Sequence, residues 1–352
     1  MIRKTHSKEK TTYFYVLLSI LIMVILTIVS LIYYYSKLKQ ITLVEATGSR
    51  TYSKHYAMIT DSTETEYWDQ VYVGALEEAK QHDAYVERIG ESMELNSEVD
   101  DLLRIAINSS VDGIIVPGSE DEERVRLINE AVEKGITVVT VGRDAIKSNR
   151  QCYVGINNYN LGKEYGKQII TLNEEREKKI RKVYVLVEEV STDTSQSITM
   201  LGLQETIEKQ YGKDSGIEVN AIPVNNKSTF GADESIRDVF MKANQLPDVL
   251  VCLNATYTQC AYQAAVNYNM VGEVAILGYY NSDAILSAVA KDIVQATIGI
   301  DTRQMGALCL QALKEYENAG YVSTYEPVKT SLITQREALE RLEAQEKEQS
   351  LE

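Results

Sequence analysis

Histidine is scarce in this chain of 352 residues, and the motifs of common catalytic sites are absent. None of the three histidines (His6, His55 and His82) follows a predicted strand in a cleft position. There is also no glycine-rich phosphate loop, no His/Glu metal pair at helical spacing and no serine elbow. We therefore expect a protein that is not an enzyme and that holds no cofactor or metal ion. These absences leave open catalysis by carboxylate groups alone.

Cysteine and basic residues are also in short supply. The four cysteines have no metal or redox spacing. We expect them to be small buried hydrophobes, although an outside compartment would permit one disulfide. Lysine and arginine number 36 against 51 aspartates and glutamates, for a net charge of −15. Because nucleic-acid binding needs a basic footprint, a nucleic-acid partner is excluded.

Charge is missing altogether from Thr11–Ser36. Within this run Phe14–Ile32 is almost wholly Leu, Ile, Val and Met, and a bilayer core needs about 20 such residues in a helix. Tyrosines flank the run, and the basic residues before it favour a cytoplasmic N-terminus. We predict a cytoplasmic tail (1–12), a transmembrane helix (13–35), a linker (36–54) and a C-terminal bulk outside the cell membrane.

A cleaved signal peptide is the main alternative for this run. Its apolar region would span about 7–15 residues and end at a small-residue cleavage site. Here Lys37-Leu38-Lys39 follows instead, and no cysteine stands there for lipidation. A buried soluble helix would need a polar face. The sequence therefore favours a retained, single-span anchor.

After the linker, continuous apolar strands such as Gly113–Pro117 and Val249–Leu253 alternate with segments of helical periodicity. This pattern is typical of a parallel sheet covered by helices on both faces. It occurs twice, so we predict an α/β fold of two doubly wound, Rossmann-like lobes. The charged end, 335–352, is expected to be a frayed helix or a disordered tail.

Polar residues that directly follow the strands are the candidate site. Ligands of open α/β sheets bind beyond the carboxyl ends of the strands, and two facing lobes would bring those ends together in a cleft. The candidates are Asp61–Trp68, Arg143, Asn157–Asn158, Ser191–Ser197, Asn254 and Tyr280–Asn281.

An ordered set of signatures runs along the chain, at Ala57–Ser62, Tyr67-Trp68, Val111–Val116, Val139–Arg143, Gly155–Asn158, Leu161-Gly162, Ala275–Tyr280 and Ala296–Ile298. Together they resemble a type I periplasmic binding protein of the ribose/galactose-binding branch, whose core is shared with LacI-type repressors. The resemblance covers roughly 55–339 and depends on order and spacing. It implies a hinge and an inter-lobe cleft in a domain at 55–334. The first lobe would be 55–157 plus 281–297, and the second 158–280 plus 298–334.

The resemblance also implies a role for each matching residue. Tyr67 and Trp68 would stack on the apolar face of a sugar ring, although their helical periodicity also permits one of them to be core. Arg143 would donate to two oxygens through its planar guanidinium. The remaining implied ligand-binding residues are Asp61, Thr65, Asn158, Asn254 and Tyr280.

The chain departs from the family pattern where acids are usual, at Gly142, Asn157 and Tyr280. We therefore expect a cleft that is more aromatic and less acidic than that of a monosaccharide binder. A glycoside, a modified sugar or another small polar ligand is then open, as is a cleft without a small ligand.

Structural roles compete with these functional ones. Arg143 can form an ion pair with Asp144, and Asn254 can cap the following helix. The pair Asn157–Asn158 can serve as a hinge. Phe230 is expected to pack in the core rather than to stack on a ligand.

These observations predict a membrane-anchored solute-binding protein that captures a sugar or sugar-like ligand and presents it to an ABC importer. The alternative is a sensory subunit that signals to a membrane histidine kinase or receptor. A LacI-type regulator is excluded because it would begin with a basic helix-turn-helix, where this chain has its uncharged run. An interaction module with no small ligand is a third possibility.

Overall fold

The structure is a computed structural model that describes most of the chain after Ser53. The described ranges are 52–61, 64–90, 98–189, 194–213, 215–225, 228–242 and 245–349, together with Met23 and Thr27. The predicted transmembrane helix, 13–35, lies outside these ranges apart from those two residues. Among the described residues, no helix combines the length and apolar character needed to cross a bilayer.

The first lobe is built on a fully parallel sheet with the order β11-β5-β4-β3-β1-β2. Two pairs of helices pack against it, one pair on each face. Successive residues of β1 point to opposite faces, because Tyr56 and Met58 belong to one apolar cluster and Ala57 to another. Its strands are β1 (Lys54–Met58), β2 (Ala84–Arg88), β3 (Gly113–Pro117), β4 (Thr137–Val141), β5 (Cys152–Gly155) and β11 (Tyr325–Pro327). Its helices are α2 (Thr65–Gln81), α3 (Val99–Asn108), α4 (Glu122–Glu133) and α10 (Thr302–Ala319).

The second lobe repeats this topology in a sheet of order β12-β10-β9-β8-β6-β7, of which only β12 runs antiparallel to its neighbour. The duplication confirms the two doubly wound lobes that the sequence predicted. The strands are β6 (Lys182–Glu188), β7 (Glu218–Val224), β8 (Val249–Cys252), β9 (Ala275–Tyr279), β10 (Ala296–Ile300) and β12 (Thr330–Thr334). The helices are α5 (Asn158–Glu175), α6 (Ser195–Tyr211), α7 (Thr229–Met241), α8 (Ala255–Asn267), α9 (Asp283–Ala290) and α11 (Gln335–Gln349).

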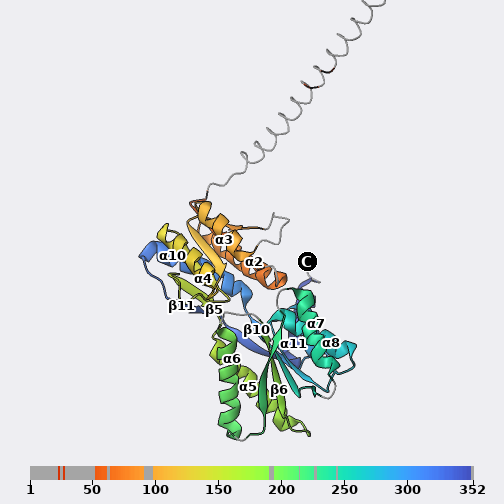
Figure 1. The fold of residues 1–352 in the computed structure, drawn as a ribbon. Helices are drawn as coiled ribbons and strands as arrows, with labels where there is room; N and C mark the ends of the chain where they lie inside the picture. Colours follow the sequence, from red (N-terminus) through yellow and green to blue (C-terminus); the bar gives the residue numbers. More distant parts are fainter. Residues whose placement is uncertain are drawn as a thin grey trace, which may run out of the picture. The chain divides into compact units, whose positions relative to one another are not determined.

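Three short connections join the lobes: between β5 and α5, between β10 and α10, and between β11 and β12. The assignment of elements to the two lobes differs from the one expected from the sequence. Residues 281–297, assigned above to the first lobe, contain α9 and the start of β10, and β10 pairs with β9 and β12 in the second sheet. Helix α10 and strand β11, assigned to the second lobe, belong to the first (Figure 1).

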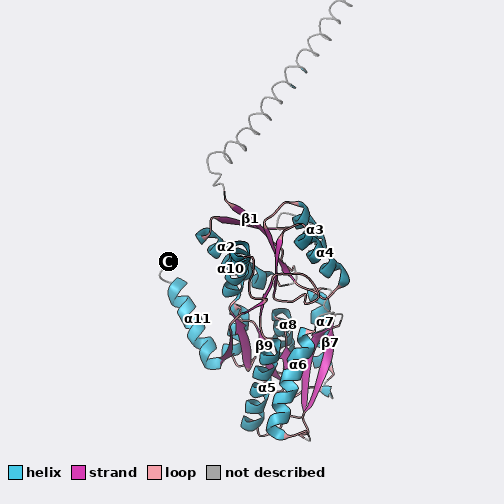
Figure 2. Cartoon of the chain, turned by 90° about the vertical axis from the view of Figure 1, so that its left-hand side faces the viewer, coloured by secondary structure: helices cyan, strands magenta, loops and turns pink. Residues whose placement is uncertain are grey.

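Close helix contacts through glycine explain where α10 lies. A methyl group at Gly306 of α10 would overlap the carbonyl oxygen of Val71 in α2, and one at Gly74 of α2 would overlap that of Arg303. The backbones of the two helices therefore touch. The same device joins α5 and α6, which run side by side in Figure 2, because Gly162 and Gly202 each abut a carbonyl oxygen of the facing helix.

Two further expectations concern the cysteines and the charged end. Cys152, Cys252, Cys260 and Cys309 are all buried free thiols. Burial raises the pKa of each thiol above its ordinary value, as expected for inert core residues. The charged end is helical over α11, which packs against α9 and buries Ala338.

Candidate functional site

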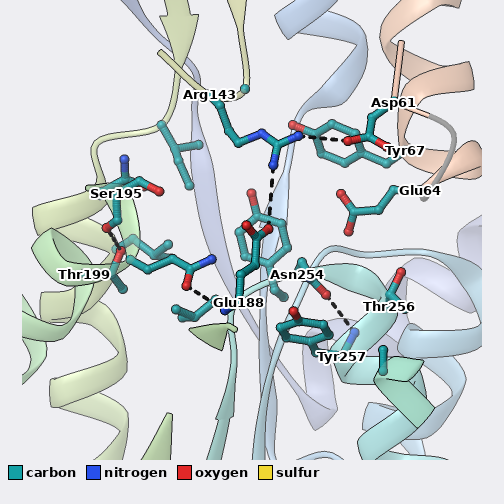
Figure 3. Close-up of a pocket in the computed structure, with 18 of the residues that line it drawn as sticks. Asp61, Glu64, Tyr67, Arg143, Glu188, Ser195, Thr199, Asn254, Thr256 and Tyr257 are labelled. Atoms are coloured by element: carbon teal, nitrogen blue, oxygen red, sulfur yellow. Dashed lines mark hydrogen bonds and ion pairs between the residues drawn. The ribbon is translucent and has the colours of Figure 1, made fainter. Parts of the chain in front are cut away.

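A cavity of about 190 Å³ lies between the carboxyl ends of the strands of the two lobes. Side chains from both lobes line it, as Figure 3 shows. We call it the central cavity. Its lining residues are Asp61, Glu64, Tyr67, Trp68, Gly142, Arg143, Ile156, Asn158, Leu161, Glu188, Ser195, Gln196, Thr199, Ser228, Ala232, Leu253, Asn254, Thr256, Tyr257 and Tyr279.

Arg143 is the central charged group of this cavity. It follows β4, and its Nη2 donates to Asp61 Oδ2, beyond β1 of the same lobe, at 2.8 Å. Its Nη1 lies 3.6 Å from Oε1 of Glu188, the last residue of β6 in the other lobe. Figure 3 shows the guanidinium pointing at both carboxylates. One arginine therefore holds an ion pair within its lobe and a second across the cavity.

Glu64 makes another contact between the lobes. It precedes α2, and its Oε1 accepts a hydrogen bond from the backbone N–H of Ala255, the first residue of α8, at 3.1 Å. A carboxylate at a helix N-terminus is favoured by the unpaired N–H groups there. Burial nevertheless raises the pKa of Glu64 to about 7, and the nearby charge of Asp61 adds to the rise, while the N–H of Ala255 and the charge of Arg143 oppose it.

The aromatic pair Tyr67 and Trp68 is both core and lining. The side chains are 5 % and 4 % exposed, and they meet edge to face with their ring centroids 5.2 Å apart. Gly142, with φ +72°, leaves room beside them, because a Cβ there would stand 3.5 Å from Trp68 Cη2. The Tyr67 hydroxyl donates to Met305 Sδ at 3.2 Å. Both rings are therefore core side chains that also line the cavity.

The asparagine and tyrosine groups supply the neutral polar surface. Asn254 Oδ1 accepts from the backbone N–H of Tyr257 at 2.7 Å and so caps α8, while its side-chain amide group lines the cavity. Asn157 caps α5 in the same way and is exposed, whereas Asn158 lines the cavity. The hydroxyl of Tyr257 is buried and has no hydrogen-bond partner among the residues that the structure describes.

Residues 56–320 match the periplasmic binding protein domain family. The chain belongs to this family. The resemblance of its sequence to periplasmic binding proteins is thereby confirmed, and the family is one of binding proteins. No curated protein matches the chain.

Solved structures similar to this periplasmic binding protein include sugar-binding proteins. GanP, a glucose-galactose binding protein from Geobacillus stearothermophilus, is 24% identical with a TM-score of 0.70, covering 81% of this chain and 99% of its own. XylFII in the XylFII-LytSN complex is 22% identical with a TM-score of 0.66, covering 82% and 100%. A sugar-binding protein of a sugar ABC transporter from Bacillus halodurans is 20% identical with a TM-score of 0.66, covering 81% and 99%. At these identities the likeness establishes the fold.

Six of the eight residues that the sequence put forward line the cavity of this periplasmic binding protein. They are Asp61, Tyr67, Trp68, Arg143, Asn158 and Asn254. Thr65 is exposed and does not line it. Tyr280 does not line it either, because β9 ends at Tyr279 and the backbone turns at Tyr280 to φ +76°. Tyr279 lines the cavity instead, and the ring of Tyr280 packs against that of Tyr67 with the ring centroids 5.5 Å apart.

Three carboxylates line the cavity, those of Asp61, Glu64 and Glu188. Asp61 was put forward from the sequence, and Glu64 lies within the candidate range Asp61–Trp68 but was given no role. Glu188, at the end of β6, lies outside the candidate ranges. A charged residue closing the apolar run of β6 was the available signal for Glu188. Phe230 is 71 % exposed and does not pack in the core as expected.

Proposed function

We propose that this chain is a membrane-anchored, extracytoplasmic solute-binding protein that captures a sugar or sugar-like ligand in the central cavity and presents it to the permease of an ABC importer. The observation that carries the proposal is the constellation at Arg143, with one carboxylate from each lobe on its guanidinium and an aromatic pair beside it. The similar sugar-binding structures support the ligand class.

The chemistry of the lining suits hydroxyl groups held between the lobes. Carboxylates accept hydrogen bonds from hydroxyls, and a guanidinium donates several in one plane. A ligand that enters between Arg143 and Glu188 replaces a long ion pair of 3.6 Å with two sets of shorter hydrogen bonds. Tyr67 and Trp68 offer apolar ring surface to a sugar ring. Such a ligand joins the lobes, so the three inter-lobe connections act as a hinge that closes on it.

The partner is a membrane protein in this proposal because the chain is tethered. The uncharged run Thr11–Ser36 supports a permanent anchor, and tethering raises the effective concentration of the closed lobes at one membrane face. A sensory role is the second candidate. The observation that favours it is the XylFII-LytSN complex, in which a protein of the same fold was solved together with a second protein.

A thermal-shift screen of the full chain in detergent micelles tests the ligand class. Glucose, galactose, xylose and arabinose form the panel, and we expect at least one to raise the melting temperature, since binding to the folded state alone stabilises it. Arg143→Ala should reduce the shift at the same sugar concentration. Arg126→Ala, which removes an exposed arginine that is ion-paired on α4, is the matched control and should retain it. A panel that leaves the melting temperature unchanged would count against a sugar ligand.

A further inference from the structure

A second cavity of about 340 Å³ adjoins the central one. The two share Ile156, Asn158 and Ser195 in their linings, so these residues lie at the boundary between them. We call it the outer compartment, and it too draws residues from both lobes: Tyr153 of β5 and Ile146 from the first, Tyr159 of α5 and Ile198 of α6 from the second.

The two compartments differ in chemistry. The central cavity presents Asp61, Glu64, Arg143 and Glu188, whereas the outer compartment presents mainly rings and aliphatic side chains. Its three most exposed apolar groups are Ile146 at 67 %, Ile198 at 39 % and Tyr159 at 37 % exposure. Single exposed apolar side chains are ordinary on a protein surface, but three converging on one cavity beside a ligand site are not.

The acids of the outer compartment are already paired. Arg150 Nη2 donates to Asp144 Oδ2 at 2.6 Å, and a second bond joins the Arg150 Nε to the same carboxylate. Glu120 accepts from the backbone N–H of Ile146 at 2.6 Å and lies 3.3 Å from Lys147 Nζ. Neither carboxylate therefore needs a polar ligand. The lining also includes Asn157, Asn158, Thr194 and Ser195, but most of the exposed lining surface is apolar. Tyr153 and Tyr325, stacked with centroids 5.5 Å apart, form a rigid part of it.

Size points in the same direction. Ligand pockets of proteins usually measure about 300–1,000 Å³. The central cavity alone falls below that range, which suits one small ring, and the two compartments together fall within it.

We infer that the ligand is a glycoside of two rings, with its sugar ring among the charged groups of the central cavity and its second ring against Ile146, Ile198 and Tyr159 of the outer compartment. Asn158 and Ser195, which face both, lie at the glycosidic linkage. The second ring is either a further sugar, through its apolar face, or an aryl group. This inference rests on the sugar-binding function proposed above and specifies its substrate class.

Isothermal titration of the full chain in detergent micelles tests it. The probes are glucose, galactose, xylose and arabinose, the phenyl glycoside of each, and disaccharides that carry each as one ring. We expect a phenyl glycoside or a disaccharide to bind about tenfold or more tighter than its parent monosaccharide, the gain of roughly 1.4 kcal/mol that burial of one apolar group supplies. Comparing the phenyl glycosides with the disaccharides shows whether the outer compartment binds an aryl ring or a second sugar ring.

Variants locate the gain. Ile198→Ser and Ile146→Ser should remove most of the advantage of the two-ring probe and leave the affinity for the monosaccharide unchanged. Leu201→Ser is the matched control, because Leu201 is 48 % exposed on the same helix and lines neither compartment. Monosaccharide binding with no two-ring advantage, or with an advantage that both variants retain, overturns the inference and leaves the proposed function standing. No binding of any probe overturns both.

Discussion

At the scale of single residues, Arg143 is the group that links carboxylates of the two lobes across the central cavity. Its guanidinium holds Asp61 at 2.8 Å and lies 3.6 Å from Glu188. Both carboxylates need a cation between them, because like charges at such a site repel one another. In the proposed complex, the sugar hydroxyls lie between Arg143 and Glu188 and bond to both groups in place of their 3.6 Å contact.

Arg143→Ala should therefore reduce ligand affinity by about 10- to 100-fold, the loss expected for hydrogen bonds to a charged group. Arg143→Lys should recover only part of the affinity, since an ammonium lacks the planar fork. Isothermal titration with the sugar identified in the thermal screen measures both. Equal affinity of the alanine variant and the parent would remove Arg143 from the site.

Glu64 adds a pH dependence at the same scale. Its pKa is raised from 4.5 to about 7 in the folded protein, mainly by burial. Between about pH 4.5 and 7 the folded chain thus holds a proton that the unfolded chain has released. The contribution of this group to stability is complete below that window and is lost as the pH rises through it.

Glu64→Gln removes this titration and keeps an oxygen that can accept from the Ala255 N–H. Urea unfolding of the ligand-free chain at pH 5, 6, 7 and 8 measures the effect. The difference in unfolding free energy, parent minus variant, should become smaller as the pH rises from 5 to 7 and then level off. A difference that stays constant across these pH values would show that Glu64 does not titrate in this window.

Residue patterns alone could locate part of this site. Asp61, Arg143 and Asn254 directly follow apolar strands, so the rule that ligands bind at the carboxyl ends of parallel strands was sufficient to find them. Glu64 lies within the candidate range Asp61–Trp68, but its hydrogen bond to the N-terminus of α8 in the other lobe is a contact that no local pattern encodes. Tyr280 failed because a one-residue error at a strand end moves a side chain to the opposite face.

At the scale of elements, strong periodicity was predictable from the sequence, and the short strand β11 was not. The buried strands β3 and β8 read as uninterrupted apolar runs. Strand β11 has three residues and ends in Pro327, a composition that carries no strand pattern of its own. It is placed by pairing with β5, which is tertiary information.

The lobe assignment of α10 also depended on tertiary contact. A helix that follows a crossing strand can return to either lobe, and backbone contact between Gly306 and α2 selects the first. Glycine there is the residue that the packing requires, although alanine is the better helix former by about 1 kcal/mol.

Gly306→Ala should accordingly lower the free energy of unfolding by about 1–3 kcal/mol, because overpacking a tight contact outweighs the gain in helix propensity. Urea unfolding monitored by circular dichroism gives the value. The sign discriminates between the two effects: a variant that is more stable than the parent would mean that α10 does not touch α2 as described.

At the scale of the whole molecule, both lobes repeat one topology and meet at their strand ends. The contacts that bridge them include the ion pair of Arg143 with Glu188, the hydrogen bond of Glu64 to the N-terminus of α8, and the packed rings of Tyr67 and Tyr280. Relative motion is the ordinary behaviour of two domains in one chain, and a ligand that contributes further bonds on both sides shifts the equilibrium towards the closed form. In the function proposed above, this closed form is the shape that the membrane partner recognises.

The central claim is that a sugar-like ligand binds among Arg143, its two carboxylates and the aromatic pair. Trp68 is the one tryptophan of the chain and lines that cavity, so its fluorescence reports on the site without a label. Titration of the full chain with the sugars of the panel should give a saturable change for at least one of them, and Arg143→Ala should move its midpoint to a sugar concentration at least about tenfold higher. A saturable change of the same midpoint in the Arg143→Ala variant, or no change with any sugar, would contradict the claim.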